Sequence, residues 1–247
     1  MSIPLNDAER QRYQRQMMID GWGDATQQKL KDCSVFVAGA GGLGSPVSIY
    51  LAVAGVGELR ISDCDTPDLS NLNRQILHDP TRLGTNKAVS ARMTLERQNP
   101  DVTITALSER IDDQSVDRLV GDADCIVDCL DNFPTRYILN DCAIRKGIPL
   151  VHGAIQGLQG QMTFIHVPRT GCLRCLVEEA PPKTVFPVVG ATPGVIGTLQ
   201  AMETLKYLTS IGQNLAGEIL LWDGALVEFR RLKLAKDPAC PSCGHVQ

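Results

Sequence analysis

The sequence has no long hydrophobic run, no apolar segment near its N-terminus and no excess of positive charge. Its longest apolar stretches are broken by glycine, proline or charged residues well short of the roughly 20 residues that a membrane-spanning helix needs. The polar N-terminus lacks the apolar core of a secretory signal peptide. These absences predict a cytoplasmic protein with no membrane partner. The net charge of −4 argues against nucleic acid as the main partner.

Cysteine is absent from residues 176–239 but occurs nine times in the rest of the chain. In a reducing compartment these residues are expected to be thiols or metal ligands rather than disulfides. The length of 247 residues, with 43% hydrophobic and 21% charged residues, is ordinary for a soluble globular protein. It suffices for one large α/β domain, and we expect residues 1–247 to form a single domain.

The chain up to residue 153 alternates between strand and helix patterns, which predicts a doubly wound, mainly parallel sheet with right-handed crossovers. Apolar runs bounded by turn residues predict strands at 33–39, 57–63, 101–110, 124–130 and 148–154. Between and before them, helices are predicted at 6–20, 25–31, 45–56, 86–100, 113–120 and 134–146.

After residue 153 the pattern changes. Antiparallel strands are predicted at 159–167, 217–224 and 225–234, the last two joined at Asp223-Gly224, a hairpin signal. Residues 194–212 have apolar side chains at helical spacing and predict a core helix. The segment 177–189 contains three prolines and no clear period, which predicts a loop able to move over a site.

A glycine turn joins the strand predicted at 33–39 to the helix predicted at 45–56. Gly39-x-Gly41-x-x-Gly44 matches the dinucleotide fingerprint in the context that the fingerprint requires. The helix N-terminus there offers N–H groups and a positive dipole end to a phosphate. Asp63 ends the next strand, where a carboxylate usually holds a ribose hydroxyl. The turn predicts a nucleotide site; alone it does not separate NAD from ATP, nor exclude a tight packing turn without ligand.

Charged residues elsewhere favour ATP. Arg74 lies in a polar loop, Lys87 opens a helix, and Asp131 and Asn132 follow a strand at the carboxyl edge of the sheet, where such folds bind ligands. One arginine, one lysine and one aspartate around a glycine turn suit a triphosphate with Mg²⁺. Taken singly, Arg74 and Lys87 would be interpreted as solvated surface charges, and Asp131 as a helix cap. The joint placement of all three residues is what supports the site.

Four cysteines form two C-x-x-C knuckles that are separated by 64 residues. Cys172-x-x-Cys175 and Cys240-x-x-Cys243 together predict a closed tetrahedral Cys₄ zinc site with a structural role. The alternatives are a redox dithiol pair or unrelated thiols. His245 is a possible substitute ligand, although four thiolates are already present.

Several motifs make the sequence resemble the MoeB/ThiF/HesA family, the bacterial relatives of ubiquitin-activating enzymes, over nearly its whole length. They are "RYQRQ", "GAGGLG", "DCDTPDLSNLNRQ", "GTNKA", "DCLDN", the paired C-x-x-C and "GVIGTLQAMETLKYL". The resemblance implies a Rossmann-like α/β domain that forms homodimers. It also implies ATP-dependent adenylation of the C-terminal Gly-Gly carboxylate of a small ubiquitin-like sulfur-carrier protein, for molybdopterin or thiamine-type biosynthesis.

The resemblance also implies roles for single residues. Gly42 would lie beside the phosphates, Asp63 on the ribose and Lys87 on the phosphate oxygens. Asp131 would bind Mg²⁺, with Asn132 nearby. Arg15 would reach the site of the partner subunit, so that Arg15, Arg74, Lys87 and Asp131 form the catalytic set. The loop lining the nucleotide would comprise Ser70, Asn71, Leu72, Asn73, Arg74 and Gln75. Residues 1–153 would be the nucleotide-binding half and 154–247 the carrier-binding half.

One departure from the family pattern concerns sulfur. Members that form a persulfide or thioester with their carrier usually have a cysteine in the crossover loop. In this sequence that loop is residues 178–194, "EEAPPKTVFPVVGATPG", and it contains no cysteine. We therefore expect the reaction to stop at the acyl-adenylate, with sulfur coming from a separate donor. Cys64, beside Asp63, is the one other thiol to watch.

The sequence leaves three other functions open. They are adenylation of a peptide terminus or a tRNA-borne carboxylate, an NAD-dependent oxidoreductase, and a catalytically silent nucleotide-binding scaffold. The four histidines, at 78, 152, 166 and 245, form no recognisable catalytic arrangement and are interpreted as core or surface residues.

Overall fold

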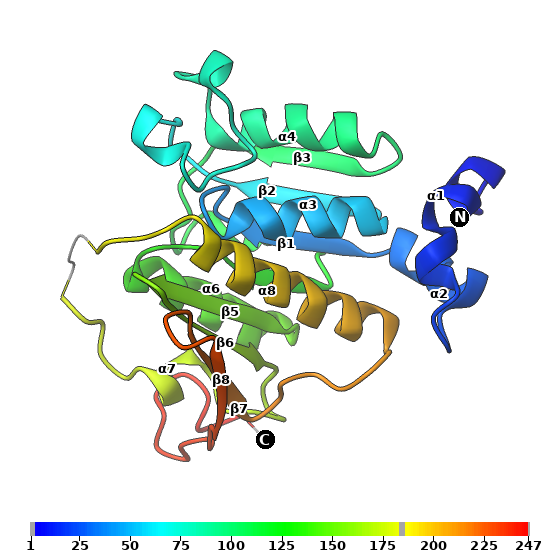
Figure 1. The fold of residues 1–247 in the computed structure, drawn as a ribbon. Helices are drawn as coiled ribbons and strands as arrows, with labels where there is room; N and C mark the ends of the chain where they lie inside the picture. The colour runs from blue at the N-terminus through cyan, green and yellow to red at the C-terminus, as the bar shows by residue number, and fades with distance from the viewer. Residues whose placement is uncertain (1–2, 183–185, 247) are drawn as a thin grey trace.

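A single eight-stranded sheet runs through the protein in the order β3-β2-β1-β4-β5-β6-β7-β8 (Figure 1). The computed structural model describes residues 3–182 and 186–246. The strands β1 to β5 are parallel: β1 (Ser34–Ala38), β2 (Glu58–Ser62), β3 (Thr103–Leu107), β4 (Cys125–Asp128) and β5 (Leu150–Gln156). Antiparallel strands extend them: β6 (Gln159–Ile165), β7 (Glu218–Asp223) and β8 (Glu228–Lys233). The predicted mainly parallel sheet with an antiparallel extension is confirmed.

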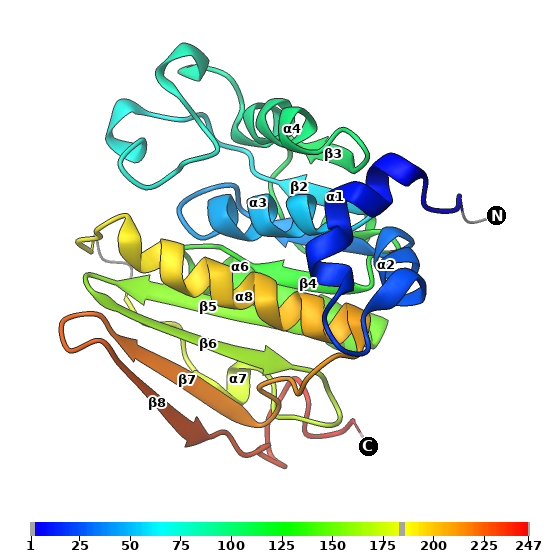
Figure 2. The ribbon, with the colours of Figure 1, turned by 45° about the vertical axis from the view of Figure 1, so that its right-hand side comes forward.

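Helices cover both faces of the parallel part. One face carries α3 (Gly44–Ala54), α4 (Lys87–Gln98) and α8 (Ala191–Thr209), with α3 and α8 packed side by side (Figures 1 and 2). The other carries α5 (Val116–Val120) and α6 (Phe133–Lys146). Alternate side chains of β1 enter the two cores, Val35 and Val37 one, Phe36 and Ala38 the other. Burial on both faces explains why this strand is a continuous apolar run.

The N-terminal helices α1 (Asp7–Met17) and α2 (Gly23–Lys31) lie at the opposite end of α3 from the glycine turn (Figures 1 and 2). Asn6 and Glu9 form a reciprocal capping box, each donating its backbone N–H to the other's side chain at 2.9 Å. Gly55, which ends α3 with φ +87°, leaves room for Tyr13, whose ring would lie 2.5 Å from an added Cβ. The end of α3 therefore receives α1.

Some boundaries differ from the predictions. The short helix α7 (Leu173–Leu176) and two 3₁₀ turns, Leu69–Asn71 and Pro80–Arg82, lie in segments predicted as loop or left unassigned. Helix α8 begins before Gly194, at Ala191, because proline at 193 is tolerated in a first helical turn. The β7–β8 hairpin is present, but its loop spans residues 224–227, longer than the two-residue turn that Asp223-Gly224 predicts.

Part of the predicted mobile loop, residues 183–185, lies outside the described residues. No helix in the described ranges has both the length and the apolar character needed to cross a membrane.

Candidate nucleotide site and cysteine cluster

The glycine turn between β1 and α3 admits no side chain at two of its positions. A Cβ at Gly44 would lie 1.9 Å from the carbonyl oxygen of Gly39. Gly39 itself has φ +98°, and a Cβ there would lie 2.9 Å from the backbone oxygen of Cys129. No side chain caps the N-terminus of α3, so this turn leaves the helix end available to an anion.

Asp63 lies directly behind the turn. Its Oδ2 accepts the N–H of Ala40 at 2.9 Å, and its Oδ1 accepts the N–H of Asp65 at 2.9 Å. Burial raises the pKa of Asp63, although these hydrogen bonds and nearby Lys87 act in the opposite direction. The carboxylate is thus held against the turn at the end of β2, which is where a ribose-binding acid is expected.

Arg74 and Gln75 lie against the turn from the loop that follows β2. A Cβ at Gly42 would be 3.5 Å from Arg74 Cγ, and one at Gly41 would be 3.5 Å from Gln75 Nε2. The Arg74 guanidinium donates to two acceptors of its own loop, at 2.9 and 3.0 Å. Gln75 is buried, and its Oε1 has no partner within the described chain. Both side chains are therefore near enough to meet a nucleotide there.

Of the other predicted residues of this loop, Ser70 and Asn73 are exposed. Asn71 is half-buried and accepts the N–H of Asp68, while Ser70 and Asn73 supply the two oxygens that Arg74 binds. Leu72 is half-buried. A Cβ at Gly190 would lie 2.3 Å from the backbone oxygen of Asn73, so the crossover loop packs against this loop at Gly190.

Lys87 is brought to the site by the start of α4. Its side chain is buried, and Nζ lies 3.6 Å from Asp65 Oδ2. The charge of Lys87 also acts on Asp63. His78 also supports the turn, because its Nε2 lies 2.9 Å from the carbonyl oxygen of Ala40. A cation and the predicted ribose acid therefore lie together beside the turn.

Asp131 and Asn132 follow β4, the neighbour of β1 in the sheet. Asn132 caps α6, its Oδ1 accepting the N–H of Thr135 at 3.0 Å. Capping thus falls to Asn132, not to Asp131. Asp131 is exposed, and its Oδ1 accepts a long hydrogen bond from Asn132 Nδ2 at 3.5 Å. It forms no ion pair within the described ranges, so its carboxylate is available to a cation. The chemistry of this position fits Mg²⁺.

Arg15 does not reach the glycine turn of its own chain. It is exposed on the last turn of α1, and α1 contacts the end of α3 through Gln16, which donates to the carbonyl of Ala54 at 2.7 Å. Helix α3 alone spans about 16 Å between that contact and the turn. The placement of Arg15 in a partner's site stays a prediction.

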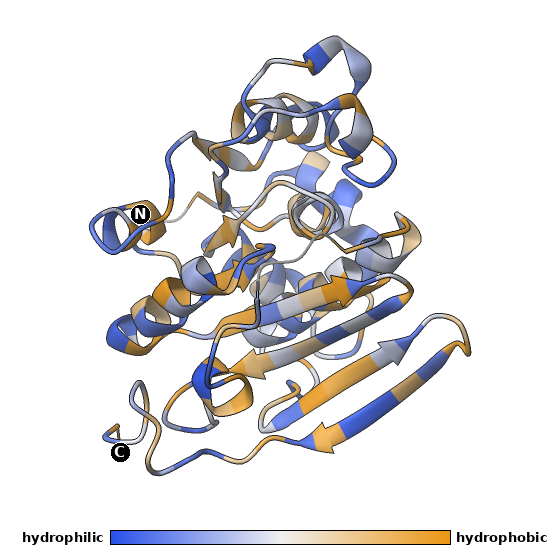
Figure 3. Cartoon of the chain, turned by 90° about the vertical axis from the view of Figure 1, so that its left-hand side faces the viewer, coloured by the Kyte–Doolittle hydropathy of each residue, from blue (hydrophilic) through white to orange (hydrophobic). Residues whose placement is uncertain are grey.

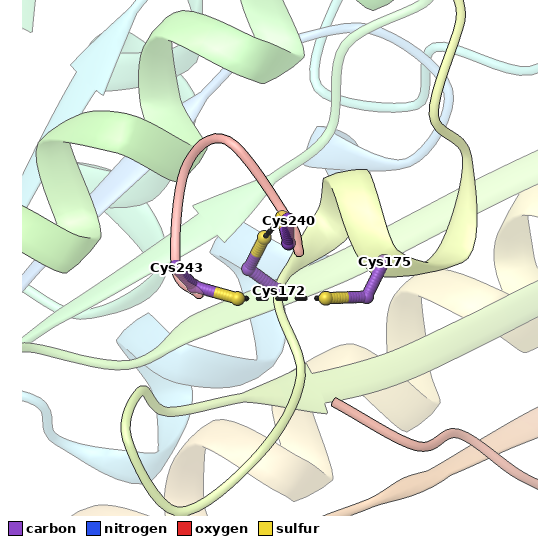
Figure 4. Close-up of side chains that lie close together, drawn as sticks. All are labelled: Cys172, Cys175, Cys240 and Cys243. Carbon is purple, nitrogen blue, oxygen red and sulfur yellow. Dashed lines mark hydrogen bonds between the residues drawn. The ribbon is translucent and has the colours of Figure 1, made fainter. Parts of the chain in front are cut away.

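Four cysteines form a tight cluster (Figure 4). The sulfur atoms of Cys172, Cys175, Cys240 and Cys243 all lie within 4.8 Å of one another, with pairs at 3.6 and 3.4 Å. A tetrahedral zinc ion with bonds of about 2.3 Å needs sulfur atoms about 3.8 Å apart, so the donor set fits zinc. His245 is exposed, and the cluster is complete without it. The cluster joins the segment after β6 to the C-terminal tail.

Removing one of the four proposed zinc ligands is expected to destabilise the protein. Cys243→Ser should reduce bound zinc to about a tenth or less of one equivalent and lower the unfolding temperature by roughly 5–15 °C, because metal binding contributes free energy of folding. Metal analysis and thermal unfolding measure both. Cys64→Ser, at an exposed thiol outside the cluster, is the matched control and should change neither. Full zinc content and an unchanged unfolding temperature in Cys243→Ser would contradict the assignment.

Fold and site together define a class. A doubly wound sheet whose glycine turn gathers an aspartate, a lysine and an arginine is a nucleotide-binding α/β protein. The model of the ThiF family matches residues 13–242, and the chain belongs to this family.

Similar proteins cover nearly the whole chain. The chain is 42% identical to a SAMP-activating enzyme E1 of Haloferax volcanii, covering 99% of this chain and 92% of the relative. It is 41% identical to a sulfur carrier protein adenylyltransferase of Thermus thermophilus, covering 96% and 91%. It is 40% identical to a molybdopterin-synthase adenylyltransferase of Salmonella typhimurium, covering 97% and 98%.

Solved structures agree on the fold. The crystal structure of E. coli MccB with succinimide superposes with a TM-score of 0.86 at 22% identity, covering 97% of this chain and 75% of MccB. MccB crystallised with ATP gives a TM-score of 0.84 at 22% identity, covering 97% and 75%. At this identity the likeness establishes the fold alone.

Buried polar residues behind the site were not predicted. Asp128 opens the motif "DCLDN" and His152 is one of the four histidines, but the sequence assigns a site role to neither of them, nor to Arg136 or Gln200. His78 and His152 are indeed buried. The available signal was an aspartate inside the apolar strand "CIVD", because a charge is rarely fully buried without a partner.

Proposed function

We propose that this protein transfers AMP from ATP to the C-terminal Gly-Gly carboxylate of a small ubiquitin-like sulfur-carrier protein. Lys87 and Arg74 at the glycine turn carry this proposal, because an NAD-dependent oxidoreductase has no need of cations there. The names of relatives at about 40% identity, an adenylyltransferase of a sulfur carrier and one of molybdopterin synthase, support it.

The chemistry requires charge stabilisation more than acid–base catalysis. The attacking carboxylate is already ionised at pH 7. One of its oxygens bonds to the α-phosphorus as the bond to the pyrophosphate oxygen breaks. Arg74, Lys87 and the N-terminus of α3 would bind the phosphate oxygens, while Asp63 holds the ribose. Asp131, with Asn132 beside it, would hold Mg²⁺, which supplies charge to offset the repulsion between carboxylate and triphosphate.

The carrier would bind the half formed by residues 154–247, and the nucleotide the half formed by 1–153. Strand β8 is the outer edge of the sheet and is exposed along its length, with Phe229 at 50% and Leu232 at 53% exposure. Figure 3 shows hydrophilic and hydrophobic residues mixed along this edge. An exposed edge strand with apolar side chains suits a protein partner.

Three further features belong to the proposal. The enzyme would act as a homodimer in which Arg15 completes the partner's site. Sulfur would come from a separate donor protein, because the crossover loop has no cysteine that could carry it. The compartment would be the cytoplasm, where a thiolate cluster stays reduced and can hold zinc.

ATP–pyrophosphate exchange tests the proposal. The enzyme is incubated with Mg²⁺, ATP, labelled pyrophosphate and, one at a time, every ubiquitin-like protein of the same genome that ends in Gly-Gly. One of them should raise exchange more than about a hundredfold over the same protein without its last two residues, because the reacting carboxylate is then misplaced. Binding of NAD without exchange would favour an oxidoreductase, and binding of ATP without exchange a silent scaffold.

A further inference from the structure

A buried ion network begins at Asp128, three residues before Asp131, the carboxylate proposed to hold magnesium. Asp128, at the end of β4, and His152, in β5, are completely buried, and Arg136 of α6 is 5% exposed. His152 Nδ1 lies 2.7 Å from Asp128 Oδ2, and Arg136 Nε lies 3.4 Å from the same oxygen. One carboxylate thus receives an imidazole and a guanidinium inside the core.

The charge states follow from this arrangement. Burial alone raises the pKa of Asp128, but Arg136 and the hydrogen bond from His152 bring it below its ordinary value. Burial lowers the pKa of His152, which leaves the ring neutral with its proton on Nδ1. Asp128 and Arg136 therefore form a neutral ion pair.

This pair fixes the backbone of Leu130 on both sides. Asp128 Oδ1 accepts the N–H of Leu130 at 3.0 Å. Arg136 Nη2 donates to the carbonyl oxygen of Leu130 and, at 3.0 Å, to that of Gly153. From α8, Gln200 Nε2 donates to the carbonyl of Asp128 at 2.8 Å. The N–H and C=O of Leu130 and the C=O of Asp128, all between β4 and Asp131, are therefore bound by buried side chains.

Stability alone does not account for the network. Arg136 Nε, His152 Nε2 and Gln200 Oε1 are buried without a hydrogen-bond partner among the described residues. Each such atom loses its hydration without a compensating hydrogen bond, which lowers the stability of the fold. A buried ion pair is often replaceable by apolar side chains without loss of stability. What apolar side chains cannot do is bind both the N–H and the C=O of Leu130.

We propose that Asp128 and Arg136 are positioning residues that hold Leu130 so that Asp131 presents its carboxylate to the metal–triphosphate complex. This inference rests on the proposed function. Neither residue touches the nucleotide; both act through the backbone next to Asp131. Their removal should therefore weaken binding of the divalent ion more than binding of the nucleotide.

The test compares Arg136→Lys with the double variant Asp128→Asn/Arg136→Met. Lysine keeps the charge beside Asp128 but loses the double donation to Leu130 and Gly153. The double variant removes both charges and leaves neither buried alone. Arg145→Met, on the same helix at an exposed surface pair with Asp117, is the matched control. Circular dichroism and thermal unfolding identify the folded fraction.

Two readouts separate positioning from stability. Mn²⁺ binding is measured by electron paramagnetic resonance with a non-hydrolysable ATP analogue, and exchange is measured against Mg²⁺ concentration. Both variants should require about tenfold more metal, a loss expected for a displaced ligand support, while metal-free binding of the analogue changes less than about twofold. Arg145→Met should match the wild type.

The outcomes are distinct. Folded variants with wild-type metal requirements would overturn the inference, as would failure of both variants to fold, which would make the network a stability element. If the wild type catalyses no exchange, the proposed function fails, while Mn²⁺ binding with the ATP analogue still tests the positioning.

Discussion

Asp131→Ala is expected to lower ATP–pyrophosphate exchange about a thousandfold or more, the loss typical of removing one charge-stabilising group in phosphoryl transfer. The fold should survive, because Asp131 is exposed and makes no ion pair among the residues described, and the helix cap is Asn132. The unfolding temperature should therefore stay near that of the wild type. Exchange at saturating carrier and thermal unfolding measure the two effects.

Two controls make the result specific. Asp122→Ala changes an exposed aspartate before β4, at the other end of the same strand, and should exchange normally. Asn132→Ala removes the cap of α6 and should cost about 1 kcal/mol of stability.

Arg74→Ala should share the catalytic loss of Asp131→Ala. Near-normal exchange in both Arg74→Ala and Asp131→Ala would refute the nucleotide site.

Regular elements could be predicted because their residues carry the pattern locally. Strand β1 is an apolar run that ends in glycines, and α4 begins after Asn86, whose side chain caps it. Helix α7 could not be predicted in this way, because Leu173–Leu176 is shorter than two helical turns and has no readable period. Its position depends on the cysteine cluster, which brings together segments far apart in the sequence.

The residues of the candidate site also fall into two groups, those that a local sequence pattern predicts and those that it does not. The glycine turn and Asp63 lie within one strand–helix–strand unit at a spacing that the chemistry requires, so the sequence reveals them. Lys87 and Arg74 could be assigned only jointly, and the structure brings both to the turn. The pair of Asp128 and Arg136 could not be predicted, because its partners come from separate elements and only their burial shows that the charges must meet.

Arg15 offers the sharpest test of the proposed homodimer. Arg10, Arg12 and Arg15 lie on one helix, and Arg10 and Arg12 form ion pairs with aspartates of their own chain. Arg15 forms no such pair within the described residues, and it lies about one α3 length from its own glycine turn. An exposed arginine that is too far for its own site remains able to reach the site of a second subunit.

Arg15→Ala should lower exchange about a thousandfold, as loss of a charge-stabilising arginine does, whereas Arg12→Ala should leave it near normal. Equal amounts of Arg15→Ala and Arg74→Ala dimers are then dissociated and reassociated together. In a two-fold symmetric dimer each mixed pair has one site with both arginines intact, so about a quarter of wild-type activity should return. If Arg15 acted within its own chain, every site would lack one arginine and no activity would return. Absence of recovery with proven subunit exchange therefore contradicts the shared site.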